Sequence, residues 1–291
     1  MPLTIIHKLQ PHLDLWAPRL LSILRVIVAF LFIQHGTQKL FGFPSVAEPP
    51  GPELAQLWLL AGVLETCGGL AILLGLFTRP VAFILSGEMA VAYFLVHARE
   101  NVWPILNGGD LAAFYCFMFL YLAAAGGGAW SLDRLWRGDR KAPGGFLSAW
   151  EPQLLSILRI VAAFLFLVHG TEEILGIPWP PDAEPFPGPD LSSRVGIAHL
   201  IETVFGPLLL VGLFTRPVAF LLSGEMAFAY FLSHAPRDFW TVINAGEDAV
   251  FFCFVFLYFV ARGGGPWSLD KVWRRSARWG FQKEARAFTT G

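Results

Sequence analysis

Residues 75–98 read GLFTRPVAFILSGEMAVAYFLVHA, and residues 212–235 read GLFTRPVAFLLSGEMAFAYFLSHA. Only three of the 24 positions differ between the two stretches. A match of this length is typical of a duplicated domain and not of a short solenoid repeat. The sequence therefore predicts two copies of one structural unit within the same chain.

The similarity extends well beyond these two stretches. The segment LSILR at residues 21–25 recurs at residues 155–159, an offset of 134, whereas the offset is 137 after the first loop. The second copy thus carries three extra residues between Gly170 and Glu202. We expect the first copy to occupy residues 1–143 and the second copy residues 144–291.

The composition indicates a membrane protein with several spans. Hydrophobic residues make up 55% of the chain and charged residues 15%, with a formal net charge of −1. This balance is wrong for a soluble protein of this length, and the near-zero charge gives no sign of a nucleic-acid partner. Cys67, Cys116 and Cys253 lie in apolar runs and form no CxxC pair, so a dithiol redox motif is absent from the sequence.

Each copy contains four apolar segments of a length that suits a membrane-spanning helix. They are residues 20–40, 55–77, 80–98 and 109–125, followed by 154–174, 195–214, 217–235 and 246–262. An even number of spans gives both copies the same orientation. The predicted fold is all-α, with eight transmembrane helices arranged as two tandem four-helix bundles in parallel orientation.

The distribution of Lys and Arg predicts which side faces the cytoplasm. Four of them, Lys39, Arg99, Arg194 and Arg237, fall on one side of the predicted spans, and the remaining 17 of 21 fall on the side of the termini. Basic residues accumulate on cytoplasmic loops. We therefore expect both termini in the cytoplasm and the chain in a membrane of the bacterial inner type.

Two short stretches after the fourth spans are predicted to lie at the cytoplasmic interface. They begin at Ser131 and Ser268 and read SLDRLWRGDRK and SLDKVWRRSARWGFQK. Both serines are expected helix N-caps, and tryptophan next to arginine suits a helix at the membrane surface. We expect one such interfacial helix in each copy.

Charged and polar side chains inside the predicted spans are the candidate site residues, because such groups are costly in a membrane. In the first copy they are His35, Lys39, Glu65, Glu88, His97, Asn107 and Asp110, and in the second copy His169, Glu173, His199, Glu202, Glu225, His234, Asn244 and Glu247. Their positions predict, in each bundle, a polar pocket that opens toward the outer half of the membrane.

Three interpretations of these groups stay open at this stage. They form a hydrogen-bonded network that fastens the helices together. Alternatively, they form a site for a small ligand with a polar head, such as a quinone, with His and carboxylate groups as proton donor and acceptor. The third interpretation is ligation of a metal or haem, but no cluster of histidines with metal-ligand spacing occurs within one helix, so no metal site is predicted.

Several motifs together resemble the DoxX family. They are His-Gly-x-x-Lys-Leu-x-Gly at residues 35–42, Glu-x-x-Gly-Gly-Leu-x-x-x-x-Gly-Leu-x-Thr-Arg at residues 65–79, Asn-Gly-Gly-Asp before the fourth span and Gly-Gly-Gly-x-Trp-Ser-Leu-Asp after it. The resemblance implies four-helix membrane units similar to the membrane subunit of thiosulfate:quinone oxidoreductase. It therefore implies a redox setting more firmly than it implies a reaction.

The second copy departs from this family pattern at two places. Glu173 stands where the first copy has Lys39, and Pro207 lies within the second span of the second copy. A family-type site is therefore expected in the first copy. Two placements of Lys39 and Glu173 are open: they pair with each other across the two copies, or each faces the pocket of its own copy.

Three classes of function follow from the sequence. The first is a membrane subunit associated with quinone-linked electron transfer, in which a partner subunit or a bound quinone does the redox chemistry. The alternative is a non-catalytic accessory or scaffold subunit of a larger respiratory or photosynthetic membrane complex. A transporter or receptor is the third. No catalytic residue is assigned by the sequence.

Overall fold

The computed structural model describes residues 2–49, 51–138, 145–180 and 184–273, and within these ranges every regular element is a helix. Five helices are long and apolar enough to cross a membrane: Gln10–Phe41, Pro52–Leu74, Thr78–His97, Glu151–Leu175 and Arg194–Val211. They match five of the eight predicted spans. Helices also form at the other three, but α5 and α12 have only 16 residues, about 24 Å at 1.5 Å per residue. Eight membrane crossings therefore stay a prediction.

The helices of the two copies follow the same order. In the first copy they are α1 (Pro2–Phe41), η1 (Pro52–Leu54), α2 (Ala55–Val63), η2 (Leu64–Gly68), α3 (Gly69–Leu74), α4 (Thr78–Ala92), η3 (Tyr93–His97), α5 (Asp110–Ala125) and α6 (Leu132–Arg137). In the second copy they are α7 (Phe146–Ala149), α8 (Glu151–Leu175), α9 (Arg194–Val211), α10 (Thr215–Ala229), η4 (Tyr230–His234), α11 (Thr241–Asn244) and α12 (Glu247–Arg262). The elements η2, η3 and η4 are π-helical turns.

Two stretches differ from the sequence-based expectation or are not described. The helix α1 begins at Pro2, about five turns before the predicted start of the first span, and continues through Pro11 and Pro18. The predicted interfacial helix after Ser131 is α6, and the Ser131 hydroxyl accepts a hydrogen bond from the Arg134 amide at 3.3 Å. Most of the stretch predicted after Ser268 lies outside the described residues.

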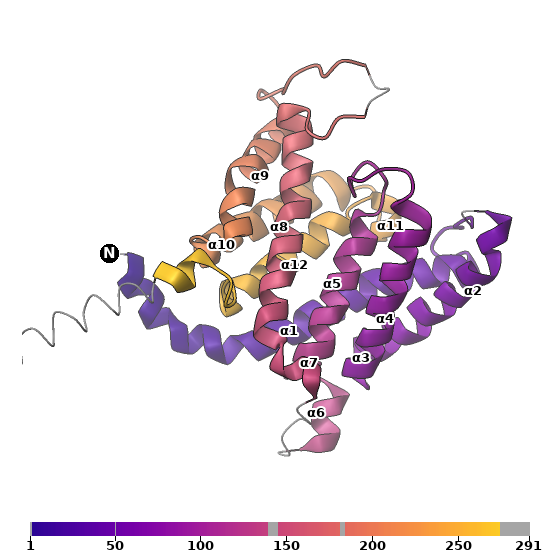
Figure 1. The fold of residues 1–291 in the computed structure, drawn as a ribbon, viewed down its shortest axis with the longest axis horizontal. Helices are drawn as coiled ribbons and strands as arrows, with labels where there is room; N and C mark the ends of the chain where they lie inside the picture. The colour runs from indigo at the N-terminus through magenta and orange to yellow at the C-terminus, as the bar shows by residue number, and fades with distance from the viewer. Residues whose placement is uncertain (1, 50, 139–144, 181–183, 274–291) are drawn as a thin grey trace, which may run out of the picture.

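The first and fourth long helices of both copies pack together at the centre. Figure 1 shows α1 beside α12 and α5 beside α8, so each first helix lies along the fourth helix of the other copy. The buried apolar side chains of the two copies form one continuous core. The remaining long helices, α2 to α4 and α9 to α10, flank this central group.

Equivalent residues of the two copies meet each other between α5 and α12. The rings of Phe114 and Phe251 stack with centroids 3.9 Å apart, and the hydroxyl oxygens of Tyr121 and Tyr258 are 2.6 Å apart. Both pairs are related by the offset of 137, and they lie two helical turns apart. These pairings of equivalent residues indicate a pseudo-twofold relation between the two copies, with its axis passing between α5 and α12.

A buried arginine fastens one end of each copy. Arg25 is 1% exposed, and its guanidinium donates to the carbonyls of Gly127 (3.0 Å), Leu73 (2.6 Å) and Trp130 (2.6 Å). Arg159 makes the same contacts in the second copy, with Gly264, Leu209 and Leu210, and Trp267. We call these groups the end clamps. They satisfy carbonyls that would otherwise have no donor at the helix end.

The aspartate of the WSLD motif belongs to the same end of each copy. The Asp133 carboxylate accepts hydrogen bonds from the amides of Phe77 and Thr78, both at 2.8 Å, and Asp270 does the same for Phe214 and Thr215. These amides begin α4 and α10, so the aspartates cap a neighbouring helix as well as lying in the first turn of their own.

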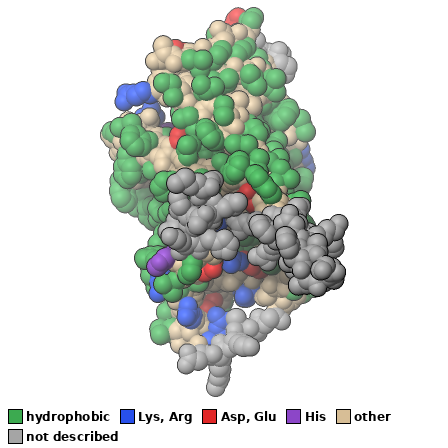
Figure 2. All heavy atoms as spheres, turned by 90° about the vertical axis from the view of Figure 1, so that its left-hand side faces the viewer, with side chains coloured by type: hydrophobic (Ala, Val, Ile, Leu, Met, Phe, Trp, Pro, Cys, Tyr) green, Lys and Arg blue, Asp and Glu red, His purple; other side chains and the backbone are tan. Residues whose placement is uncertain are grey.

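Figure 2 shows hydrophobic side chains over most of the upper part of one face, with charged side chains gathered in its lower part.

Candidate functional site

The first copy encloses a cavity of about 690 Å³ bounded by α1, α2, α4 and α5. Leu57, Leu60, Ile84 and Val91 line it, and each is also about half exposed on the outside of the helix group. The cavity therefore opens sideways between α2 and α4, toward the region that lipid occupies around a membrane protein. Its polar lining comes from the predicted residues His35, Lys39, Glu65, Glu88 and His97, together with Glu48 and Tyr115.

Lys39 and Glu65 form the ion pair at the polar end of this cavity. The Lys39 ammonium lies 2.6 Å from both carboxylate oxygens of Glu65, which is 2% exposed, and 4.8 Å from the ring centroid of Trp58. Glu65 sits in the π turn η2, a local irregularity that frequently marks functional sites. A Cβ atom at Gly36 would lie 2.9 Å from the Glu65 Cβ, so only glycine lets α1 approach this turn so closely.

Glu88 lies in the same cavity without a hydrogen bond. Both its carboxylate oxygens are buried and have no hydrogen-bond partner among the described residues, and Glu225 in the second copy is in the same state. The interpretation in which these carboxylates fasten neighbouring helices is not met at Glu225, whereas the Glu88 carboxyl interacts with Glu65 of the second span. The Glu88 side chain lines the cavity near Glu65, where it is able to meet a ligand.

His35 connects the first copy to the second. Its Nε2 atom lies 2.8 Å and 2.9 Å from the two carboxylate oxygens of Glu247, at the start of α12. The Tyr115 hydroxyl donates to the same carboxylate. One wall of the cavity is therefore fixed by a residue of the other copy, which the sequence assigns to a separate pocket.

Asp110 makes the reciprocal contact in the opposite direction. Its carboxylate lies 3.6 Å from Nε2 of His169, on α8 of the second copy. The sequence groups Asp110 with His35 and Glu65, but the structure places it at the interface between the copies. The physical reason is that α5 packs beside α8, which the order of helices along the chain does not reveal.

His97 and Asn107 organise the loop before α5. The Nδ1 atom of His97 lies 2.9 Å from the Asn107 carbonyl oxygen, and the Asn107 side chain bonds to the Asn101 carbonyl and the Gly109 amide, both at 2.8 Å. His234 and Asn244 make the matching contacts in the second copy. Of these four residues, only His97 is among those that line the first-copy cavity.

The remaining predicted residues of the second copy lie around α8, α9 and α10. Nδ1 of His199 is 4.0 Å from a carboxylate oxygen of Glu173, while Glu202 is 5% exposed and has one oxygen without a hydrogen bond. Lys39 pairs with Glu65 and Glu173 lies beside His199, so of the two placements that the sequence leaves open, the structure excludes the pairing of Lys39 with Glu173. Each residue faces the polar groups of its own copy.

Comparison with known proteins identifies the family. The family model described as DoxX matches residues 20–98 and 154–235, one segment in each copy. The chain belongs to the DoxX family. It is an integral membrane protein with two DoxX segments in tandem, and no solved structure matches it.

The curated relatives of this DoxX-family chain correspond in length to one copy. An uncharacterized protein of Haemophilus influenzae is 46% identical over 126 residues, which cover 94% of that protein and 42% of this chain. Inner membrane protein YphA of Escherichia coli is 32% identical over 128 residues, covering 90% of it and 40% of this chain. Inner membrane protein YqjF of the same organism is 34% identical over 119 residues, covering 87% and 38%.

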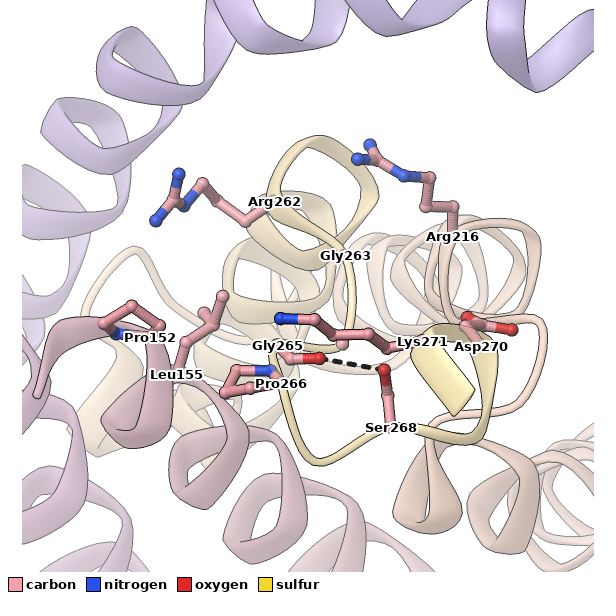
Figure 3. A pocket seen from close by; sticks show the side chains of 11 residues that line it. Pro152, Leu155, Arg216, Arg262, Gly263, Gly265, Pro266, Ser268, Asp270 and Lys271 are labelled. Carbon is pink, nitrogen blue, oxygen red and sulfur yellow. Dashed lines mark hydrogen bonds between the residues drawn. The ribbon is translucent and has the colours of Figure 1, made fainter. Parts of the chain in front are cut away.

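A second, basic pocket lies in the second copy, at the end where α8 begins and α12 ends. Its volume is about 430 Å³, and Arg216, Arg262 and Lys271 surround the turn at residues 263–266 (Figure 3). Arg216 donates to the Ala261 carbonyl at 2.7 Å, and Arg262 pairs with Glu151. These arginines already bind helix ends and a neighbouring carboxylate, so we assign this pocket to the structural end of the second copy.

The described part of the chain contains no group of three His, Cys, Asp or Glu side chains placed to hold a metal ion. Sequence reasoning missed Tyr115 and Trp58, which contact the charged residues of the cavity. It also missed the structural role of Arg25. The signal for Arg25 was available, because an arginine inside a long apolar run needs buried acceptors.

Proposed function

We propose that the first copy binds a lipid-soluble molecule with a polar head of the quinone class, and that the protein serves quinone-linked redox chemistry in the membrane. The observation that carries this proposal is the cavity itself. The cavity has apolar walls and opens sideways between α2 and α4. Its other end is polar and is formed by Lys39, Glu65 and Glu88. An apolar pocket with a few convergent polar groups is the usual form of a small-molecule site.

The donors and acceptors at the polar end fit a quinone head. A quinone carbonyl accepts hydrogen bonds, which the Lys39 ammonium or a protonated Glu88 is able to donate. A hydroquinone hydroxyl donates, and the two unpartnered oxygens of Glu88 are able to accept. When bound, the quinone would supply the electron chemistry.

The residues of this chain would then bind, orient and exchange protons. Lys39 is fixed by Glu65 and by the face of Trp58, so its ammonium has a defined position at the end of the cavity. Glu88 has no partner to lose, which makes it the candidate for proton exchange with the ligand. A partner subunit would deliver or accept the electrons.

The test is a binding measurement on the purified full-length protein. Quinones extracted from the protein are identified first, and a short-chain ubiquinone and a short-chain menaquinone are then titrated into nanodiscs. Glu88→Leu is expected to weaken binding about tenfold because it removes the hydrogen-bonding group from the cavity. Glu225→Leu is the matched control in the second copy and is expected to bind quinone normally. Lack of saturable binding for both quinones would contradict the proposal.

A second candidate function is an accessory subunit of a larger membrane complex. The observation that favours it is the central packing of the copies, in which equivalent residues such as Tyr121 and Tyr258 meet and fix a permanent pseudo-dimer. Purification from native membranes in a mild detergent tests this candidate. Stoichiometric retention of respiratory or photosynthetic subunits would support it.

The proposed localisation is an inner membrane, and the two Escherichia coli relatives carry the name inner membrane protein. Both termini are proposed to lie in the cytoplasm. The proposed domains are residues 1–143 and 144–291, which keep the two DoxX segments apart.

A further inference from the structure

The first and second long helices cross at the same point in both copies. A Cβ atom at Gly36 would lie 2.5 Å from the Thr66 hydroxyl oxygen, and one at Gly170 would lie 2.8 Å from that of Thr203. Thr66 and Thr203 follow Glu65 and Glu202 directly. Residues 39 and 173, each three positions after the crossing glycine, therefore stand at equivalent places beside these two glutamates.

In the first copy, an ammonium group fills the place beside the glutamate. The Lys39 Nζ atom lies 2.6 Å from both oxygens of Glu65. In the second copy this lysine is replaced by Glu173, which brings a carboxylate in place of a cation. The electrostatic surroundings of Glu202 include both Glu225 and Glu173.

Among its described residues, the second copy thus holds buried carboxylates that pair with no cation. Glu202 is 5% exposed with one oxygen unbonded, and both oxygens of Glu225 are buried and unbonded. Within the described residues no ion pair reaches Glu202 or Glu225, since His199 pairs with the more exposed Glu173. A buried carboxylate in such surroundings requires a cation or a proton.

We propose that the second copy binds an organic cation, an alkylammonium compound, with its ammonium group between Glu202 and Glu225. Lys39 shows the chemistry that fits, because its side chain is a butylammonium group held against the equivalent glutamate. The described residues offer no set of three ligands for a metal ion, which favours the larger ammonium group. This site is separate from the proposed quinone site.

The position next to Glu225 is open on the outside of α10. A Cβ atom at Gly224 would have no heavy atom within 4 Å, as at Gly87, the equivalent glycine that lines the first-copy cavity. Leu221 and Phe228 are exposed apolar side chains on the same helix, and they suit an alkyl tail. The Glu173 side chain is 59% exposed, so it does not fill the place that Lys39 takes in the first copy.

Calorimetric titration of the full-length protein in nanodiscs with n-butylammonium chloride tests this site. We expect saturable binding of one equivalent per chain and none for 1-butanol, which has the same alkyl tail without the charge. Glu202→Gln is expected to weaken binding about tenfold or more, since it removes the charge-assisted hydrogen bond. Glu65→Gln is the matched control and is expected to leave this binding unchanged, because Lys39 already occupies the first-copy position.

Two further variants exchange the properties of the copies. Glu173→Lys supplies the missing ammonium from within the chain, so it is expected to abolish butylammonium binding and to raise the melting temperature. Lys39→Ala removes the internal cation from the first copy and is expected to add a second equivalent of bound butylammonium.

Equal heats for butylammonium and 1-butanol, or wild-type binding in Glu173→Lys, would overturn the proposal. If Glu173→Lys does not fold, an unchanged stoichiometry in Lys39→Ala would overturn it. Quinone titration of the same samples reports separately on the first copy.

Discussion

The His35 imidazole on α1 lies 2.8 Å from the carboxylate of Glu247 at the start of α12, although 212 positions separate the two residues. His169 and Asp110 make the reciprocal contact at 3.6 Å. The two copies are therefore joined by a polar pair on each side of the pseudo-twofold axis. The first of these pairs also forms part of the cavity wall, since His35 lines the cavity.

A double-mutant cycle on His35→Phe and Glu247→Gln is expected to show a coupling of about 1 kcal/mol in the free energy of unfolding, as found for polar contacts between membrane helices. Chemical denaturation in mixed micelles measures it. The exposed pair of Gln10 and Asp14, one helical turn apart on α1, serves as the control and is expected to show less coupling. Strict additivity of the two substitutions at His35 and Glu247 would contradict the prediction.

Arg25→Lys is expected to lower the free energy of unfolding by about 3 kcal/mol, because lysine does not reproduce the forked donation to several buried carbonyls. The measurement is thermal denaturation of the purified protein. Arg19→Lys is the control, since the Arg19 guanidinium bonds the Leu15 carbonyl within its own helix at an exposed position. Similar melting temperatures for the two variants would count against the end clamp.

Gly36→Ala is expected to destabilise the protein by about 1–3 kcal/mol, the range found for overpacked cores. Its Cβ would lie 2.6 Å from the Thr66 amide nitrogen, so α1 and η2 must separate. Gly87→Ala provides the comparison, since a Cβ there meets no heavy atom within 4 Å. We expect Gly87→Ala to be neutral or slightly stabilising, because alanine favours helix. Equal destabilisation by the two alanines would be the contrary result.

Replacing Glu88 by leucine is expected to raise the free energy of unfolding by about 1 kcal/mol, because it removes a buried carboxylate without a partner. Glu225→Leu is expected to act in the same direction, and both are compared with the corresponding Gln variants by denaturation. A loss of stability on going to leucine, with retention in glutamine, would show that these carboxylates form hydrogen bonds in the membrane.

Cysteine labelling tests the predicted orientation. In a variant without Cys67, Cys116 and Cys253, a cysteine at Val46 is expected to react with a membrane-impermeant maleimide in intact cells, whereas one at Leu135 reacts only after lysis. Both side chains are well exposed, so exposure does not explain a difference between them. The reverse labelling pattern would place the termini outside the cytoplasm.

Much of the helical structure is predictable from the sequence because long apolar runs and short polar joints are local signals. The Thr78-Arg79-Pro80 turn, for example, begins α4 as expected for a proline in the first turn. The pairing of Lys39 with Glu65 also follows from the pocket-facing placement that the sequence leaves open.

The contacts between the copies are not predictable from local patterns. Nothing near Asp110 in the sequence indicates that α5 packs against α8, and this packing decides that its partner is His169. The hydrogen bonding of Glu88 is also not predictable from the sequence, because it depends on which side chains of other helices lie within reach of its carboxylate. The π turn at Leu64–Gly68 has no sequence signal that we used, although it carries Glu65.

The meeting of Tyr121 and Tyr258 on the pseudo-twofold axis has a consequence for symmetry. Two identical hydroxyls that face each other cannot both donate to one another, so one direction must be chosen. Tyr121 donates to Glu151 at 2.7 Å, which leaves Tyr258 as the donor to Tyr121. The position equivalent to Glu151 in the first copy is Ala17, which has no acceptor side chain. Joining both copies in one polypeptide therefore gives this chain of hydroxyls a fixed polarity, which two identical subunits related by a true twofold axis could not encode.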